Sequence, residues 1–301
     1  MEQQAEREKR WAAASSVLGA IGLTSLKVIV GFATGSLGIL AEAAHSGLDL
    51  VAAVMTWVAV RISGRPADRS HLYGHGKVEN LSALLETGLL LATCVWIIYG
   101  AVDRLIAGKV EIEVTFWSFA VMAISIVVDV SRSRVLSRTA KKYHSQALEA
   151  DALHFSTDIW SSAVVILGLA SVKLGERHPD LPWLRYADAV AAILVALIVV
   201  WVSVQLGMRT VRALIDAAPM GLEDRVIAAV EAVPGVFNCH NVRARYSGAQ
   251  LFVDIHVLVD GRQTLEAAHD LTEQIEEAIQ RLAPGADVTV HPEPLPQPAK
   301  P

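Results

Sequence analysis

The stretch DALHFSTDIWSSAVVILGLASVKLG, residues 151–175, places a polar pair at the start of a long apolar run. His154 and Asp158 are four residues apart, so they lie on one face of a helix. The segment 146–174 around them is long enough to cross about 30 Å of hydrocarbon at about 1.5 Å per residue. An imidazole and a carboxylate in such a segment indicate a polar site inside a membrane.

Five further segments share this length and apolar character, so the sequence predicts a membrane protein with an all-α, six-helix transmembrane domain. We place the six spans at 11–33, 37–61, 79–106, 113–131, 146–174 and 187–210. The composition agrees, because only 19% of the 301 residues are charged, against about 25% in soluble proteins. The net charge of −5 gives no indication of nucleic-acid binding, and two cysteines are too few and too scattered for a disulfide framework or a cysteine zinc cluster.

The distribution of Lys and Arg predicts the orientation in the membrane. Five lie on one side of the predicted spans, at Arg104, Lys109, Lys173, Arg177 and Arg185. Fourteen lie on the other side, at Arg7, Lys9, Arg10, Arg61, Arg65, Arg69, Lys77, Arg132, Arg134, Arg138, Lys141, Lys142, Arg209 and Arg212. Because the positive side faces the cytoplasm, we expect an inner (plasma) membrane protein with both termini cytoplasmic.

From about Met220 the pattern becomes that of a small α+β domain. Amphipathic helices are predicted at 221–233 and 265–283, a hairpin at 242–260 that turns at Ser247-Gly248, and a last strand at 287–291. The order α-β-β-α-β is typical of a two-layer, ferredoxin-like fold. Alternation along the second strand predicts that its buried face consists of Leu251, Val253, Ile255, Val257 and Val259.

Together these patterns divide the chain into four parts. We expect a cytoplasmic N-terminal tail at 1–10 and the transmembrane domain at 11–212. A cytoplasmic domain follows at 213–293, and a disordered Pro-rich tail at 294–301.

The second span repeats the opening motif, because GILAEAAHSGLDLVAAVM, residues 38–55, holds His45 and Asp49 at the same spacing. A charged group inside a span costs at least ~2.5 kcal/mol, so two such pairs indicate a function. Two imidazoles and two carboxylates around one point suit Zn²⁺ or another divalent transition metal. A hydrogen bond between helices is the structural alternative, and a proton relay without metal uses the same residue types. Four more acidic residues are expected either to line a water-filled cavity or to lie at an interface: Glu42, Glu79, Glu86 and Asp129.

Histidines gather in two other places. The loop RPADRSHLYGHGK, residues 65–77, has the spacing D-x-x-H-x-x-x-H, which can wrap one metal or can simply be solvated. The C-terminal domain holds four histidines with carboxylates nearby, which predicts metal binding there: His240, His256, His269 and His291. Of these, His256 faces away from the buried side of its strand, and His240 and His291 are expected at neighbouring strand positions, with Glu293 following. We assign no role to His144 or His178.

These residues resemble the cation diffusion facilitators, a family of divalent-metal/proton antiporters, over nearly the whole chain. The resemblance is carried by GSLGILAEAAHSGLDL (35–50), RPADRSHLYGHGKVENLSALLETG (65–88), EADALHFSTDIW (149–160) and the α-β-β-α-β tail that ends in VTVHPEP (288–294).

The resemblance implies three metal sites. His45, Asp49, His154 and Asp158 would form the transport site, and Asp68, His71 and His75 the loop site. His240, His256, His269, His291 and Glu293 would bind metal in a metallochaperone-like cytoplasmic domain that helps to hold a homodimer. Family members often have an acidic residue directly after the last histidine, whereas here Pro292 intervenes before Glu293.

Two finer implications concern selectivity and assembly. In the family, His at the position of His45 resembles a zinc-selective pattern, whereas Asp there admits cadmium and other metals. Lys77 and Asp216 resemble a charge pair that links protomers near the membrane face.

Metal binding requires neutral imidazole and ionised carboxylate, so it is coupled to proton release. Histidine, with an ordinary pKa of about 6.5, suits that exchange at physiological gradients. We therefore expect Zn²⁺ efflux from the cytoplasm, driven by inward proton movement through alternating access, with Fe²⁺, Cd²⁺ and Co²⁺ as other candidate substrates. An intramembrane metallohydrolase is disfavoured, because H-E-x-x-H is missing and four protein ligands leave no open zinc position. A membrane-bound metal sensor without transport is the alternative.

Overall fold

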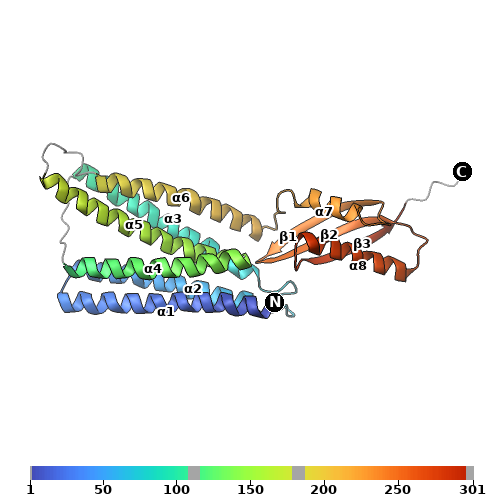
Figure 1. Ribbon diagram of the computed structural model, residues 1–301, viewed down its shortest axis with the longest axis horizontal. Coiled ribbons are helices and arrows are strands. Elements are labelled where there is room, and N and C mark those ends of the chain that lie inside the picture. The colour runs from blue at the N-terminus through green and yellow to red at the C-terminus, as the bar shows by residue number, and fades with distance from the viewer. Residues whose placement is uncertain (1, 108–115, 178–186, 296–301) are drawn as a thin grey trace. The chain divides into compact units, whose positions relative to one another are not determined.

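The computed structural model describes residues 2–107, 116–177 and 187–295. The chain divides into two compact units, residues 1–66 with 78–211 and residues 67–77 with 212–301. The first unit is helical and the second contains a small sheet, as Figure 1 shows. The fold class predicted from the sequence is therefore confirmed. Most of the predicted C-terminal tail, 296–301, lies outside the described residues.

Six long helices occupy the region where six spans were predicted. They are α1 (Glu2–Thr34), α2 (Leu37–Ser63), α3 (Lys77–Ala107), α4 (Phe116–Tyr143), α5 (Gln146–Arg177) and α6 (Ala187–Leu214). Among the described residues, α1, α2, α3 and α6 contain stretches long and apolar enough to cross a membrane by themselves. Helix α4 continues twelve residues beyond the predicted apolar span, through a stretch rich in Arg and Lys.

Small side chains allow the helices of the first unit to approach closely. Helices α1, α2, α4 and α5 share a core that consists mainly of alanine: Ala12, Ala13, Ala20, Ala53, Ala140, Ala147 and Ala152, with Val60, Leu136, Leu148 and Phe155. Helices α3 and α6 meet through Cys94, Ala196 and Val199. This packing holds α2 beside α5, the two helices that carry the H-x-x-x-D motifs.

The second unit has the predicted order of elements, α7 (Leu222–Glu231), β1 (Asn238–Ser247), β2 (Gln250–Val259), α8 (Leu265–Leu282) and β3 (Asp287–Pro294). The predicted alternation is confirmed, since Leu251, Val253, Ile255, Val257 and Val259 are all buried. They pack against Val226 and Val230 of α7 and against Leu271, Ile275 and Ile279 of α8. One face of the sheet is therefore covered by helices.

The strand order β1-β2-β3 corrects one expectation. Strand β2 pairs antiparallel with β1 and parallel with β3, because α8 carries the chain back across the sheet. His240 and His291 are therefore separated by the middle strand, where His256 is paired with each of them. The three histidines form a row across the sheet.

The loop 67–77 belongs to this second unit and packs on the β1–β2 turn. The ring of Tyr73 meets the ring of Phe252 edge to face at 5.3 Å, and the guanidinium of Arg245 lies 4.1 Å from the Tyr73 centroid. Gly76 lies directly against the backbone of Ser247, so that any Cβ at this position would clash with the Ser247 carbonyl. These contacts hold the loop that carries the D-x-x-H-x-x-x-H motif.

Candidate metal centres

The two H-x-x-x-D motifs meet between α2 and α5. The Nε2 atom of His154 lies 3.0 Å from Asp49 Oδ1 and 3.8 Å from Asp158 Oδ2. The Nε2 atom of His45 lies 4.0 Å from Asp49 Oδ1 and 3.9 Å from Asp158 Oδ1. Each imidazole therefore faces both carboxylates, although the two helices are about a hundred residues apart in sequence.

Asp49, His154 and Asp158 offer ligand atoms that all lie within 4.8 Å of one another, and His45 lies 3.9–4.0 Å from the two carboxylates at the edge of this group. Zinc bonds of about 2.0–2.1 Å separate tetrahedral ligand atoms by about 3.4 Å, and the four His–Asp distances lie on either side of that value. Asp49 and His154 are buried. The side chain of His45 is 42% exposed, which leaves the cluster open on one side.

Two buried cations, Lys27 and Arg132, lie near this cluster; the sequence did not single out Lys27, and Arg132 was counted only among the charges on the cytoplasmic side. Lys27 of α1 donates hydrogen bonds to Ser46 Oγ at 2.7 Å and to Glu42 Oε2 at 3.2 Å. Arg132 of α4 pairs with Asp129 at 3.3 Å, and its guanidinium lies 3.5 Å from the Phe155 ring centroid. The sequence does contain a signal for such residues, because a Lys or Arg inside an apolar helix needs a buried partner. Lys27 and Arg132 both occur in long helices of this kind.

The acidic residues outside the motif have different surroundings. Glu42 is exposed, whereas Glu79, Glu86 and Asp129 are buried within hydrogen-bond networks. Glu79 links its own helix α3 to three other parts of the bundle. It accepts hydrogen bonds from Lys9 of α1 at 3.0 Å and from Ser63 of α2 at 2.8 Å, and it contacts Ser145 just before α5. Three of the four therefore lie inside the packed unit.

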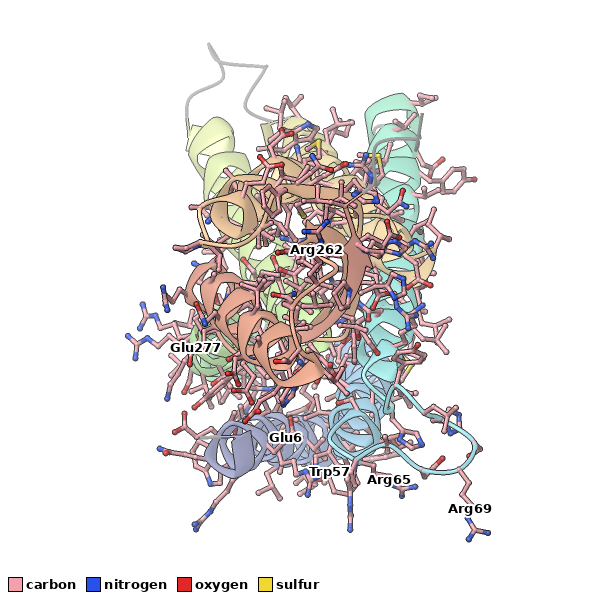
Figure 2. The ribbon with its side chains drawn as sticks, turned by 90° about the vertical axis from the view of Figure 1, so that its right-hand side faces the viewer. Glu6, Trp57, Arg65, Arg69, Arg262 and Glu277 are labelled. Atoms are coloured by element: carbon pink, nitrogen blue, oxygen red, sulfur yellow. The ribbon has the colours of Figure 1, made fainter. Side chains whose placement is uncertain are left out.

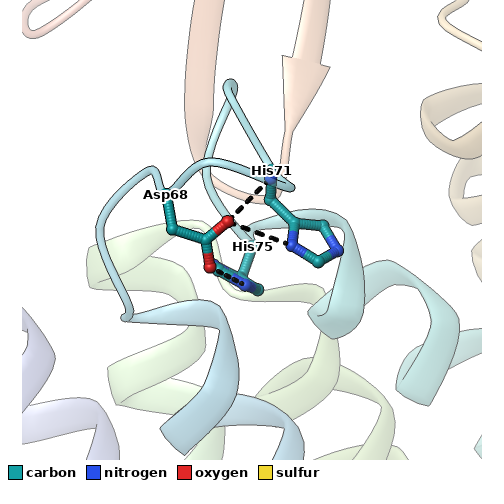
Figure 3. Close-up of side chains that lie close together, drawn as sticks. All are labelled: Asp68, His71 and His75. Atoms are coloured by element: carbon teal, nitrogen blue, oxygen red, sulfur yellow. Dashed lines mark hydrogen bonds and ion pairs between the residues drawn. The ribbon is translucent and has the colours of Figure 1, made fainter.

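The loop motif also forms a compact cluster, drawn in Figure 3. Asp68 Oδ1 lies 3.5 Å from His71 Nδ1, and Asp68 Oδ2 lies 3.4 Å from His75 Nε2. The hydroxyl of Ser70 and the backbone N–H groups of His71 and Ser70 hold the pKa of Asp68 well below its ordinary value. Arg69 is exposed and points outward (Figure 2). The cluster therefore presents an ionised carboxylate between two imidazoles.

The third cluster lies across the sheet of the second unit. Glu293 Oε1 lies 2.8 Å from His256 Nδ1 and 3.8 Å from His291 Nε2, and Glu293 Oε2 lies 3.3 Å from His240 Nε2. Strand alternation places residues 291 and 293 on the same face, so Pro292 does not keep the carboxylate from the histidines. Hydrogen bonding to His256 lowers the pKa of Glu293.

The remaining candidates have other partners. His269 lies on α8, where its exposed ring is 3.7 Å from Glu273. His144 lies in the turn between α4 and α5, and His178 lies outside the described residues. Lys77 and Asp216 pair at 2.9 Å within one chain, and Arg245 approaches Asp216 at 3.5 Å.

Comparison with known proteins gives matches over both units. The family model for the cation efflux transmembrane domain matches residues 13–215, and the model for the cation efflux protein cytoplasmic domain matches residues 219–295. The cation-efflux pump FieF of Yersinia pestis (strain Pestoides F) is 31% identical over 301 residues, which cover 98% of this chain and 95% of that protein. FieF of Salmonella arizonae is 30% identical over 284 residues, covering 94% and 92%.

Among solved structures, the chain is similar to "MamM-CTD 215-293", with 31% identity and a TM-score of 0.24. That match covers 25% of this chain and 95% of the other.

Proposed function

Because the chain belongs to the cation efflux family, the cation diffusion facilitators, we propose that it exports Zn²⁺ from the cytoplasm in exchange for protons. Efflux of divalent metal cations by a multi-pass membrane protein follows from the family itself. The identity of the metal and the coupling to protons are the new parts of the proposal.

The observation that carries the proposal is the set of four His–Asp contacts between α2 and α5. Two carboxylates balance the charge of a divalent ion, and two neutral imidazoles complete a tetrahedral set of N and O ligands. Zinc accepts this ligand set without a geometric preference from d electrons. The exposed side of His45 gives the ion a way into the cluster.

The same geometry suits proton exchange. His154 Nε2 lies 3.0 Å from Asp49 Oδ1 and 3.8 Å from Asp158 Oδ2, so a metal ion bound by these three groups would take the place of a proton on this nitrogen. A proton on this nitrogen is stabilised by both carboxylates, and a bound metal must displace it. Metal and protons therefore compete for one set of atoms, which is what an antiporter with alternating access requires.

The other two clusters complete the proposal. We assign the loop cluster of Asp68, His71 and His75 and the sheet cluster around Glu293 to regulatory metal binding on the cytoplasmic side. In this arrangement both termini are cytoplasmic, the protein lies in the inner membrane, and the second unit helps to hold a homodimer.

The test is zinc uptake into liposomes that contain the purified full chain, under an imposed proton gradient. The variant Asp49→Ala, Asp158→Ala removes both carboxylates of the cluster. The control is Glu149→Gln, which removes an acidic group of α5 that pairs with Arg209 at the surface. We expect gradient-driven uptake by the wild type and the control, and none by the double variant.

Two results contradict the proposal. Equal uptake by the wild type and the double variant would remove the transport site from α2 and α5. Zinc binding by the wild type without any uptake would favour the membrane-bound sensor. Repeating the uptake with Fe²⁺, Cd²⁺ and Co²⁺ identifies the preferred metal.

A further inference from the structure

Two carboxyl groups lie fully buried in the helical unit, away from the four proposed ligands. Glu86 of α3 and Asp151 of α5 are both 0% exposed. Asp151 precedes His154 by three residues and therefore lies about one helical turn from the proposed transport site. Two uncompensated charges at such positions would cost several kcal/mol each, so their protonation has to be explained.

Each carboxyl group has one oxygen with a hydrogen-bond donor and one without. The Thr56 hydroxyl donates to Glu86 Oε2 at 3.1 Å, and the Ser16 hydroxyl donates to Asp151 Oδ2 at 3.1 Å. Glu86 Oε1 and Asp151 Oδ1 are buried and have no hydrogen-bond donor among the described residues. The two carboxyl groups lie within hydrogen-bonding reach of each other.

This arrangement fits one shared proton. Two buried carboxylates this close repel when both are ionised, whereas one proton between them gives a partner to an oxygen of each group. The charged groups nearby are Arg132 of α4 and His154 of α5 itself. Arg132 also pairs with Asp129, so its one positive charge is shared between two carboxylates, and a proton on the Glu86–Asp151 pair removes one of the remaining negative charges.

The surrounding hydroxyls disfavour a metal ion at the same place. Arg132 donates to Ser16 Oγ at 3.1 Å, and Ser16 in turn donates to Asp151. The Ser16 hydroxyl hydrogen points toward Asp151, and the cationic guanidinium lies directly behind Ser16, so both disfavour a second cation there.

We propose that Glu86 and Asp151 form a proton-binding site, separate from the metal ligands, that takes up and releases a proton during each transport cycle. When the pair is buried, the proton bridges Glu86 Oε1 and Asp151 Oδ1. When water reaches the pair, both carboxyl groups ionise and the proton leaves to solvent, while Arg132, Ser16 and Thr56 stabilise the remaining charges. The proposal rests on proton exchange as the proposed function.

The first experiment is infrared spectroscopy of the full chain, which reads the carbonyl band of a protonated carboxylic acid without any transport. We expect the wild type to show this band at neutral pH, with a shift in heavy water. Glu86→Gln loses the band, because its amide donates to Asp151 in place of the shared proton. Glu149→Gln keeps it, since that side chain lies at the surface.

The second experiment counts protons and zinc ions moved into liposomes. We expect Glu86→Gln to move about one proton fewer per zinc ion than the wild type or Glu149→Gln. An unchanged ratio overturns the proposal, as does an acid band that persists in folded Glu86→Gln. If Glu86→Gln does not fold, the variant Asp151→Asn is tested in the same two assays.

The outcomes separate this proposal from the proposed function. If the wild type moves zinc without protons but the acid band depends on Glu86, proton exchange fails while the shared proton stands. If Na⁺ removes the band and zinc transport requires Na⁺, the pair binds sodium and the proton-site proposal is overturned.

Discussion

Replacing Lys9 with Met is expected to destabilise the helical unit strongly. The ammonium group of Lys9 is buried, and it lies 3.0 Å from Glu79, whose side chain is also buried. Removing one member of a buried ion pair costs about 3–5 kcal/mol, because the other charge stays buried without its partner. Glu79 keeps hydrogen bonds from Ser63 and Ser145. We therefore expect the lower end of that range, about 3 kcal/mol.

The measurement is the thermal midpoint of the purified full chain in detergent. At about 2–4 °C per kcal/mol for a unit of this size, Lys9→Met should lower the midpoint by about 6–12 °C. Lys9 also pairs with Glu6, which keeps Arg10 as a partner. The double variant Lys9→Met, Glu79→Met removes the buried carboxylate as well as the ammonium group, so it should recover part of the loss.

A surface ion pair is the control for this prediction. Arg209 and Glu149 lie 2.7 Å apart but are both about half exposed, so Glu149→Gln should cost less than about 1 kcal/mol. If Lys9→Met melts within about 2 °C of the wild type, or if the double variant is less stable than Lys9→Met, the buried pair does not hold the helices together.

Three further predictions concern the second unit. Gly76→Ala should loosen the loop 67–77, because its Cβ would clash with Ser247; we expect a loss of about 1–3 kcal/mol, seen as faster proteolysis of the loop. Lys77 lowers the pKa of Asp216 in the folded protein. The ion pair therefore stabilises the fold at pH values above about 4, the ordinary pKa of Asp, and this stabilisation is lost as the pH falls through the lowered pKa of the folded state. The thermal midpoints of wild type and Asp216→Asn should therefore differ by a few degrees at neutral pH and converge in acid; a constant difference would contradict this. Burial raises the pKa of Cys239 to about 11, so alkylation measured by mass spectrometry should modify it only after denaturation.

The sequence predicted the helices and strands well because apolar residues follow a different spacing in each. Long apolar runs marked six helices, and alternation along 251–259 identified the buried face of β2. The span predicted at 113–131 ended before Arg132, whereas helix α4 continues to Tyr143. In the structure the Arg132 guanidinium is buried and pairs with Asp129, so the helix continues past it.

The sites were only partly predictable from the sequence. An i, i+4 spacing indicated which residues share a face, and the structure brings the two pairs together. Spacing along one helix carries no information about partners on other helices, such as Glu79 for Lys9 or Glu86 for Asp151. The strand order was not available either, because a pattern of alternation does not say which edge of β2 receives β3.

The second unit is assembled from two stretches that the ribosome makes far apart in time. Lys77 donates a hydrogen bond at 3.2 Å to the carbonyl of Leu214, 137 residues later, and Tyr73 stacks on Arg245, which is synthesised later still. During translation the loop 67–77 is therefore synthesised long before the β1–β2 hairpin that packs against it. A nascent chain can insert all its helices and still lack this packing, so the loop acquires its final shape only when synthesis is nearly complete.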